Sequence, residues 1–243
     1  MSLNQQIERW IIEQRVQCRH KDRPFVTLSY AQSWDGSITL HSGESLALSG
    51  DQSLMLTHQL RSIHDGILVG IGTVLSDNPR LNVRQCPGPD PQPIVLDANL
   101  RIPPDARLCH LSDKRCWVMT SSGGLSPEHT DLEIIRLPGD AGGRVCLHEA
   151  MLELKQRGIH SLMVEGGANV ITGFLKQKLV DAMVLTVAPR LVGGYKAVAD
   201  LEFGSKEELP QISPMFSGML GDDLIMWGKL QYNITVPATD GNS

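Results

Sequence analysis

The sequence predicts an α/β protein with a mainly parallel central sheet and helices on both faces of that sheet. Segments with strand-like and helix-like patterns alternate along the chain, which is typical of parallel sheets with helical connections. The expected strands are continuous apolar runs, as in residues 66–70 and 161–165. Such runs indicate strands that are buried on both sides, rather than strands with one face in water.

Apolar residues at helical spacing predict four helices, over residues 3–18, 51–63, 147–156 and 169–178. In the second helix, Leu56, Leu60 and Ile63 form one apolar stripe, and Asp51 is a candidate N-cap. Gly158 is placed to end the third helix.

Strands are expected wherever short apolar or β-branched runs lie between turn signals. Trp34–Gly36 is a turn signal, and four prolines between residues 86 and 93 predict an exposed loop. The predicted strands are residues 25–30, 37–40, 66–70, 93–97, 115–120, 132–137, 161–165, 181–189 and 223–229.

Composition excludes several classes of protein. The net charge of −5 over 243 residues argues against a nucleic-acid binder, and no run of 18 apolar residues exists to span a membrane. Five cysteines without a C-x-x-C pair indicate free thiols in a reducing compartment, so we expect a cytoplasmic protein. The eight histidines show no metal-binding spacing, so no metal site is predicted.

Residues 68–81 resemble the wall of a nucleotide pocket. Gly70 and Gly72 allow a ligand to approach the backbone closely, and Thr73 and Asp77 lie one helical turn apart, so both can face one ligand. The alternative for Asp77, which precedes Asn-Pro, is a local Asx-turn without a ligand.

A second glycine segment follows the predicted strand 161–165. Glu165 would lie at the carboxyl end of this strand, where α/β proteins bind ligands. Gly166, Gly167, Ala168 and Asn169 would then present free N–H groups of a helix N-terminus to a phosphate. The G-x-G-x-x-G pattern is absent, and a plain strand-to-helix turn is the alternative.

Ser45, Arg61 and Arg84 are candidates for a phosphate clamp, since arginine offers forked donors and serine a hydroxyl. Nothing in their spacing links them, and solvated surface arginines are the alternative.

Several motifs in fixed order resemble the reductase domain of riboflavin biosynthesis, from Pro24 to about Gly194. They are Ala31-Gln-Ser-Trp-Asp-Gly36, Ser42-Gly-Glu-Ser45, Arg61, the run from Gly70 to Leu81 that matches G-x-G-T-V-x-x-D-[DN]-P-x-L, Arg84, Val164-Glu-Gly-Gly167 and Ala188-Pro-Arg-Leu-Val-Gly-Gly194. The resemblance implies a dihydrofolate reductase-like fold, NADPH as cofactor and a homodimer. It divides the chain into a helical extension (1–23), a reductase domain (24–236) and a frayed tail (237–243).

The resemblance also implies roles by position. NADPH contacts fall on Ala31, Ala47, Gly70, Thr73, Asp77, Leu81 and the phosphate-binding segment with Gly166, Gly167, Ala168, Asn169 and Gly173. The substrate, a ribosylamino-pyrimidine 5′-phosphate, would be held by Ser45, Arg61, Arg84 and Glu165, with both arginines at its phosphate. Asp77 and Glu165 are the candidate acids for proton transfer during hydride transfer to the sugar.

Three departures from the family pattern stand out. Ala47 replaces a tryptophan that contacts the cofactor in the family, and Ala98 stands where some relatives have a serine. The H-x-E and P-C-x-x-C zinc pattern of the deaminase partner domain does not occur, so we expect a stand-alone reductase.

The residues leave alternatives open. One is a reductase of the same fold acting on another pteridine or pyrimidine, and another is a non-catalytic NADPH-binding protein, which Ala47 favours. Whether the pyrimidine is the diamino or the deaminated form is also left open by the sequence.

Overall fold

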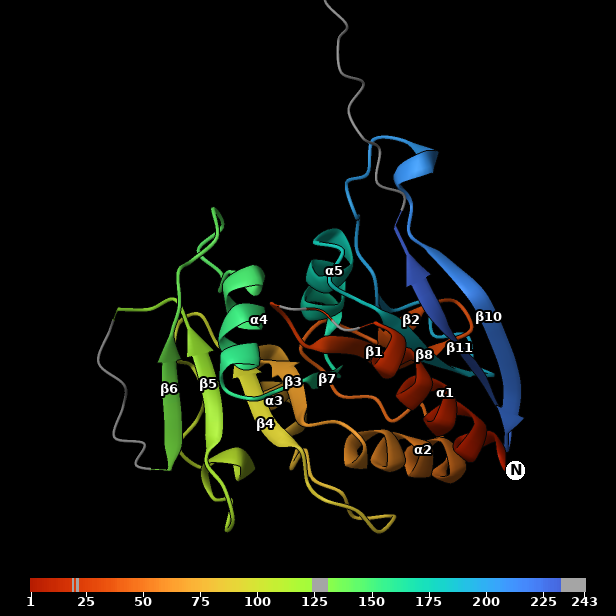
Figure 1. The fold of residues 1–243 in the computed structure, drawn as a ribbon, viewed down its shortest axis with the longest axis horizontal. Coiled ribbons are helices and arrows are strands. Elements are labelled where there is room, and N and C mark those ends of the chain that lie inside the picture. Colours follow the sequence, from red (N-terminus) through yellow and green to blue (C-terminus); the bar gives the residue numbers. More distant parts are fainter. Residues whose placement is uncertain (19, 21, 124–130, 233–243) are drawn as a thin grey trace, which may run out of the picture.

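The computed structural model describes residues 1–18, 20, 22–123 and 131–232. A nine-stranded sheet runs through the molecule in the order β10-β11-β8-β1-β7-β3-β4-β5-β6 (Figure 1). Its strands are β1 Phe25–Ser33, β3 Gly66–Gly70, β4 Gln92–Leu96, β5 Cys116–Thr120, β6 Leu132–Arg136, β7 Ser161–Val164, β8 Ala182–Ala188, β10 Gln211–Leu220 and β11 Asp223–Gln231. A separate two-stranded sheet pairs β2 Ser37–Thr39 with β9 Tyr195–Lys196.

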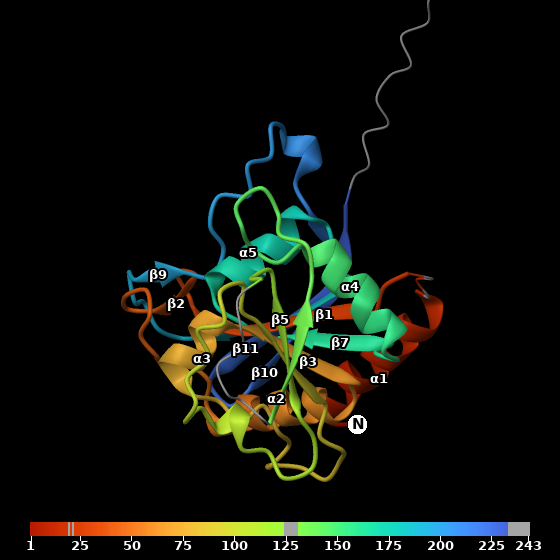
Figure 2. The same cartoon turned by 90° about the vertical axis from the view of Figure 1, so that its left-hand side faces the viewer.

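Helices cover both faces of the large sheet (Figures 1 and 2). They are α1 Leu3–Gln17, α2 Asp51–Ser62, α3 Ile71–Asp77, α4 Leu147–Gln156 and α5 Ala168–Lys176, with short 3-10 turns at Arg107–Cys109 and Lys206–Glu208. The apolar residues of α4 and α5 form one core cluster with the sheet, and those of α1, α2 and α3 pack in clusters on the opposite face.

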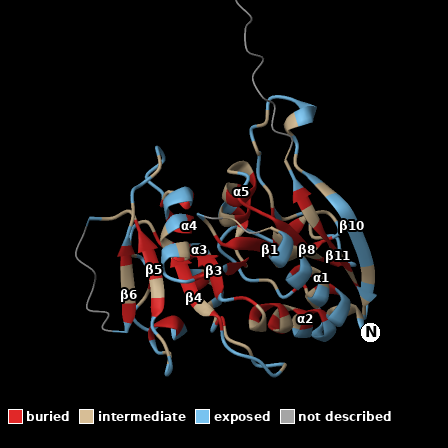
Figure 3. Cartoon of the chain, viewed as in Figure 1, coloured by how far each residue is buried: buried red, intermediate tan, exposed pale blue. Residues whose placement is uncertain are grey.

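Seven neighbouring strands, from β8 to β6 in the sheet order, run parallel, and β11 and β10 are added antiparallel at one edge. Successive residues of β3 serve opposite faces: Leu68 packs with the α4 and α5 cluster, whereas Ile67 and Val69 pack beneath it with α3. All five residues of β3 are buried, as Figure 3 shows for the centre of the sheet. The predicted α/β class with a mainly parallel, doubly covered sheet is confirmed.

Two elements of this sheet region were not predicted from the sequence. Helix α3 begins directly after β3 and carries both Thr73 and Asp77. Strand β10 was not predicted, because most of its residues are exposed and it contains Pro214 and Gly218, which weaken a strand pattern. Its partner β11 corresponds to the predicted strand 223–229.

Helix α1 is part of the core rather than a loose extension. Ile7 and Ile11 are completely buried in a cluster with α2, β8 and β11. Trp10 meets Phe216 of β10 edge-on, and Phe216 stacks on Trp227 of β11. The division into an extension and a reductase domain stays a prediction, and the proposed tail 237–243 lies outside the described residues.

Asp181, at the amino end of β8, fastens the segment before β1 to the sheet. Its carboxylate accepts two hydrogen bonds from Arg23, at 2.7 and 2.8 Å, and one from the backbone N–H of Val26. Although burial opposes the charge, Arg23 and His20 lower the pKa of Asp181 below its usual value.

In the part of the chain that the structure describes, no helix combines the length and apolarity needed to cross a membrane.

Candidate active site

A cleft of about 1100 Å³ opens at the carboxyl ends of the parallel strands. This volume is slightly above the range of about 300–1,000 Å³ that is usual for the site of one small ligand. The predicted residues that line it are Ala31, Ser45, Arg61, Gly70, Thr73, Asp77, Leu81, Glu165, Gly166, Gly167, Ala168, Asn169 and Gly173. Ala47 and Arg84 do not line it, although the neighbours Leu46 and Ser49 do.

The two glycine segments pack directly against each other at the floor of the cleft. A Cβ atom on Gly70 would lie 2.7 Å from Cγ2 of Val170, so a side chain there would force Val170 to shift. Thr73 Oγ1 accepts a hydrogen bond of 3.1 Å from the Gly167 N–H. Thr73 thus fixes the turn that leads into α5. The expectation of a free Gly167 N–H was wrong, because Thr73 engages this donor, whereas a Cβ on Gly72 would meet open space.

The first turn of α5 faces the cleft without a side-chain cap. Gly167 is the N-cap residue and makes no side-chain hydrogen bond, and Ala168 and Asn169 begin the helix. The N–H groups of a first helical turn have no partner within the helix and carry the positive end of its dipole. Together with the glycine-lined floor, this geometry fits the pyrophosphate of a dinucleotide.

Arg61 and Glu165 form a bidentate ion pair at the base of the cleft. Arg61 Nε and Nη2 donate to the two carboxylate oxygens of Glu165 at 2.8 and 2.7 Å, and Nη1 donates to the carbonyl of Asn82. Arg61 is only 8% exposed, so the alternative of a solvated surface arginine was wrong. Burial opposes its charge, but Glu165 outweighs burial and raises the pKa of Arg61.

Arg84 lies beside this pair, in a region rich in positive charge. Burial and then the charges of Arg61 and Arg80 lower the pKa of the Arg84 guanidinium. Its backbone N–H donates to Nδ1 of His58, a fully buried residue of α2. Arg84 itself is exposed and lies outside the lining of the cleft, so its role at a phosphate stays a prediction.

The remaining predicted positions differ in their surroundings. Asp77, the last residue of α3, is exposed and accepts a hydrogen bond of 2.8 Å from Ser76 Oγ. Ser45 is also exposed, and Ala98 lines the cleft after β4. Ala47 is exposed outside the cleft lining, so the site lacks an aromatic wall at this position.

Asp35 joins the first and last predicted motifs. Its carboxylate accepts hydrogen bonds from the backbone N–H groups of Val192 and Gly193, and it forms an ion pair with Lys196 at 2.7 Å. The hydrogen bonds from Lys196, Ser33 and the backbone hold the pKa of Asp35 well below its usual range. The loops after β1 and β8 are thereby held together.

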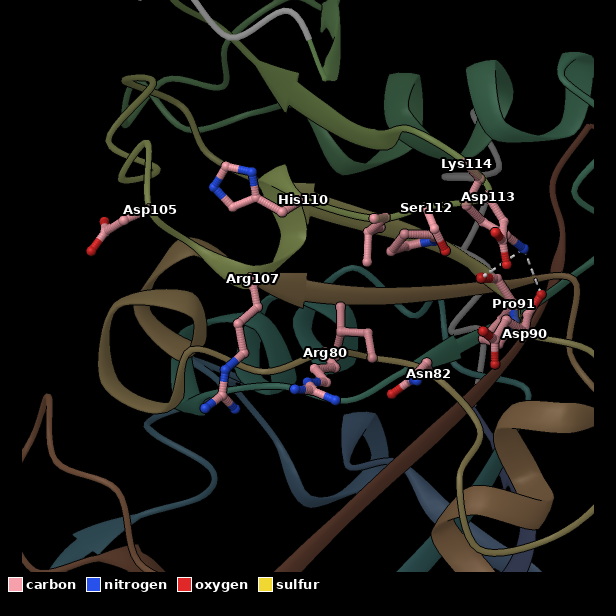
Figure 4. A pocket seen from close by; sticks show the side chains of 13 residues that line it. Arg80, Asn82, Asp90, Pro91, Asp105, Arg107, His110, Ser112, Asp113 and Lys114 are labelled. Carbon is pink, nitrogen blue, oxygen red and sulfur yellow. Dashed lines mark hydrogen bonds between the residues drawn. The ribbon is translucent and has the colours of Figure 1, made fainter.

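A smaller cavity of about 390 Å³ lies beyond Leu81, which lines both spaces. Figure 4 shows Arg80, Arg107 and Lys114 around it, interspersed with three carboxylates of Asp90, Asp105 and Asp113. Lys114 Nζ is bonded to the carbonyl of Asp90 at 2.7 Å. The mixed charges and the absence of the other predicted site residues favour the larger cleft as the functional site.

Several residues that line the larger cleft were not predicted from the sequence. They include Thr57, Asn99, Arg101, Asp140, Arg144 and Tyr195. Thr57 is four residues before Arg61, which places both on one face of α2. Asn99 and Arg101 follow β4. Because ligands bind at the carboxyl ends of parallel strands, their position after a predicted strand could have identified them as site residues.

A group of three possible metal ligands lies at the opposite, amino end of the sheet. Cys18 Sγ, His20 Nε2 and a carboxylate oxygen of Asp181 are within 4.8 Å of one another. Burial and the charge of Asp181 raise the pKa of the Cys18 thiol, and Arg23 occupies the carboxylate. Because a bound cation would compete with Arg23, this group is better explained as a structural anchor.

Residues 24–217 match the family described as the RibD C-terminal domain. A 2,5-diamino-6-ribosylamino-4(3H)-pyrimidinone 5′-phosphate reductase of Methanothermobacter thermautotrophicus is 35% identical over 84% of this chain and 97% of its own length. The enzyme of the same name from Saccharomyces cerevisiae is 37% identical over 70% of this chain and 74% of its own.

Longer relatives and solved structures agree with this match. The riboflavin biosynthesis protein RibD of Aquifex aeolicus is 31% identical, and the chain spans only 58% of its length. The solved riboflavin biosynthesis reductase of Saccharomyces cerevisiae superposes with a TM-score of 0.72 at 28% identity, covering 90% of this chain and 99% of that one.

Proposed function

Because the chain belongs to the RibD C-terminal domain family, we propose that it is an NADPH-dependent reductase of riboflavin biosynthesis. The proposed reaction reduces the ribosyl group of a ribosylamino-pyrimidine 5′-phosphate to the ribitylamino form. The names of the relatives with matching length favour 2,5-diamino-6-ribosylamino-4(3H)-pyrimidinone 5′-phosphate as the substrate. The deaminated pyrimidine is the alternative substrate.

The proposal rests on one observation: groups that suit the cofactor and groups that suit the substrate line the same cleft. The uncapped N-terminus of α5 and the floor at Gly70 and Thr73 suit a dinucleotide, and Arg61 with Glu165 lies at the same strand ends. A hydride donor and a sugar substrate must meet within one water-poor space, and this cleft is large enough for both.

The proposed substrate side uses Ser45, Arg61, Arg84 and Glu165. Arg61 spends three of its five N–H groups on Glu165 and Asn82, which leaves two for a phosphate or a sugar oxygen. Arg84 adds an exposed guanidinium in the same electropositive region. Such remote contacts orient the sugar carbon that accepts the hydride.

The cofactor, when bound, supplies the hydride; the protein supplies position and charge. We assign contacts with it to Ala31, Gly70, Thr73 and Leu81, and its phosphates to the segment from Gly166 to Gly173. Asp77 and Glu165 are the carboxylates available for proton transfer. Glu165 is held in a fixed orientation by Arg61, whereas Asp77 is exposed at the end of α3.

We further propose a cytoplasmic homodimer. The free state of all five cysteines supports a reducing compartment. Strand β10 is an uncharged edge strand with exposed Met215, Phe216 and Met219, and such an edge is a template for pairing with another chain. A molecular mass of one chain at micromolar concentration, measured by light scattering, would argue against the dimer.

A direct test supplies the purified protein with NADPH and each ribosylamino-pyrimidine phosphate in parallel. We expect loss of absorbance at the nicotinamide band, faster with the diamino substrate. Tight NADPH binding without oxidation by either substrate would support the non-catalytic alternative, which the missing aromatic wall at Ala47 favours. Oxidation that needs another pteridine or pyrimidine would support a different reductase of the same fold.

A further inference from the structure

A buried histidine of α2 holds the segment that carries Arg84. His58 is fully buried, and its Nδ1 accepts a hydrogen bond of 3.1 Å from the Arg84 N–H. We propose that His58 is a positioning residue: it holds the Arg84 backbone and so fixes the separation of the Arg61 and Arg84 guanidinium groups for the substrate phosphate. The inference rests on the proposed function, because it takes a phosphorylated substrate and these two arginines as its premise.

Two contacts join residues 82–84 to the same face of α2. Arg61 Nη1 donates to the Asn82 carbonyl at 3.1 Å, and His58, three residues earlier on the helix, accepts from the Arg84 N–H. Within the segment, Arg84 Nη1 donates to Asn82 Oδ1. The helix therefore sets the place of both ends of this segment relative to Arg61.

Packing alone does not explain a histidine at this position. Among the described residues, the buried Nε2 of His58 has no hydrogen-bond partner. A buried polar atom without a partner costs about 1–3 kcal/mol, so an apolar side chain of similar shape would be more stable there. The hydrogen bond from Arg84 to Nδ1 is what an apolar side chain could not provide.

The imidazole is neutral, as this role requires. A ring nitrogen that accepts a hydrogen bond carries no proton, and a protonated imidazole has no acceptor left. Burial, followed by the charges of Arg61 and Arg84, lowers the pKa of His58, and Glu165 opposes this shift. A neutral acceptor holds Arg84 without adding a third positive charge, and without the negative charge that a carboxylate would set against the phosphate.

The expected effect of His58 is on substrate binding rather than on chemistry. Arg84 is exposed, so its guanidinium would otherwise lose conformational freedom when it meets a ligand. A fixed backbone reduces this loss before the substrate arrives. Because the phosphate is remote from the reacting carbon, removing the contact should raise KM and leave kcat unchanged.

The test measures kcat and KM for the ribosylamino-pyrimidine 5′-phosphate and for its dephosphorylated form. His58→Leu removes the acceptor. His58→Asn has the shape of leucine but carries an oxygen on Cγ, where histidine has Nδ1, so the two variants leave similar cavities and differ in the acceptor. His64→Leu is the matched control, because His64 is a buried histidine just after α2 that bonds to Thr27 and to the Leu60 carbonyl instead.

We expect His58→Leu to raise the KM for the phosphorylated substrate by about 3-fold to 10-fold, the value of one hydrogen bond. Its kcat, its kcat/KM for the dephosphorylated form and its dissociation constant for NADPH should equal those of the wild type. His58→Asn should restore most of the wild-type KM. His64→Leu should lower the melting temperature without changing KM.

A double variant tests whether His58 acts through Arg84. Since Arg84→Ala removes the guanidinium, adding His58→Leu to it should raise KM no further. An unchanged KM in His58→Leu, an equal rise for both forms of the substrate, or additive effects in the double variant would overturn the inference. If His58→Leu does not fold, His58→Gln replaces it: its oxygen lies one bond farther out, and it is held to the same outcomes.

Hydrogen exchange of the Arg84 amide, measured by NMR, tests the contact without turnover. Exchange should be faster in His58→Leu than in the wild type, His58→Asn or His64→Leu. Unchanged exchange in His58→Leu would refute the positioning role alone. A wild-type protein that turns over neither form of the substrate would instead refute the proposed function.

Discussion

Replacing Arg61 by alanine tests the ion pair at the base of the cleft. The pair is bidentate, with N–O distances of 2.8 and 2.7 Å, and its side chains are only 10% and 18% exposed. Removing one partner of a buried pair costs about 3–5 kcal/mol, because the other charge is left without compensation. The residual exposure of Glu165 argues for the lower end of this range, about 3 kcal/mol.

In a domain of this size, 1 kcal/mol shifts the melting temperature by roughly 2–4 °C, so we expect Arg61→Ala to melt roughly 6–12 °C below the wild type. Thermal unfolding followed by circular dichroism measures this shift. The control Arg9→Ala breaks a pair whose side chains are 68% and 49% exposed, and should cost less than about 0.5 kcal/mol.

The double variant Arg61→Met with Glu165→Gln separates charge from packing. It removes both charges and should regain much of the stability lost in Arg61→Ala, without regaining activity. If Arg61→Ala melts within about 2 °C of the wild type, the pair does not hold the base of the cleft and this reasoning is refuted.

Three further predictions concern the glycine floor, a buried histidine and the turn into α5. Gly70→Ala should destabilise the fold by about 1–3 kcal/mol, since its Cβ would lie 2.7 Å from Val170 Cγ2, whereas Gly72→Ala meets open space and should melt like the wild type. Burial lowers the pKa of His64 to about 4, so its imidazole is neutral in the fold and the unfolded chain takes up its proton first on acidification. Stability should fall as pH drops from about 6.5 to 4, by roughly 3 kcal/mol in urea titrations, and His64→Gln should flatten this slope. Thr73→Val removes the acceptor for the Gly167 N–H and should weaken NADPH binding by about 3-fold to 10-fold in calorimetry. Thr73→Ser keeps the hydroxyl and should bind NADPH like the wild type. Equal NADPH binding by the two variants would contradict the role given to this hydroxyl.

Local sequence patterns were sufficient to predict the parallel strands of the central sheet. Strands such as β3 and β7 are buried on both faces, so their composition is mainly apolar, and the parallel arrangement follows from the helices between them. Strand β10 had no such signature, because its side chains are exposed and its place is set by pairing with β11. Edge pairing depends on backbone hydrogen bonds, which leave little trace in the sequence.

The candidate site was predictable only in part. The helix N-terminus at Gly167 and the glycines at the start of α3 could be inferred from local turn chemistry. The partner of Arg61 could not, because Glu165 is 104 residues away and only the sheet order brings them together. Likewise, no local pattern distinguished Arg101 and Arg144, which line the same cleft from the segment after β4 and the loop after β6.

The measurement that tests the central proposal most directly is the stoichiometry of one reaction. The protein is incubated with NADPH and 2,5-diamino-6-ribosylamino-4(3H)-pyrimidinone 5′-phosphate, and the pyrimidine product is identified by mass spectrometry. We predict one ribitylamino product, heavier than the substrate by two hydrogen atoms, for each NADPH oxidised. An unchanged substrate with intact NADPH, under conditions where calorimetry shows both ligands bound, would contradict the proposed reductase activity.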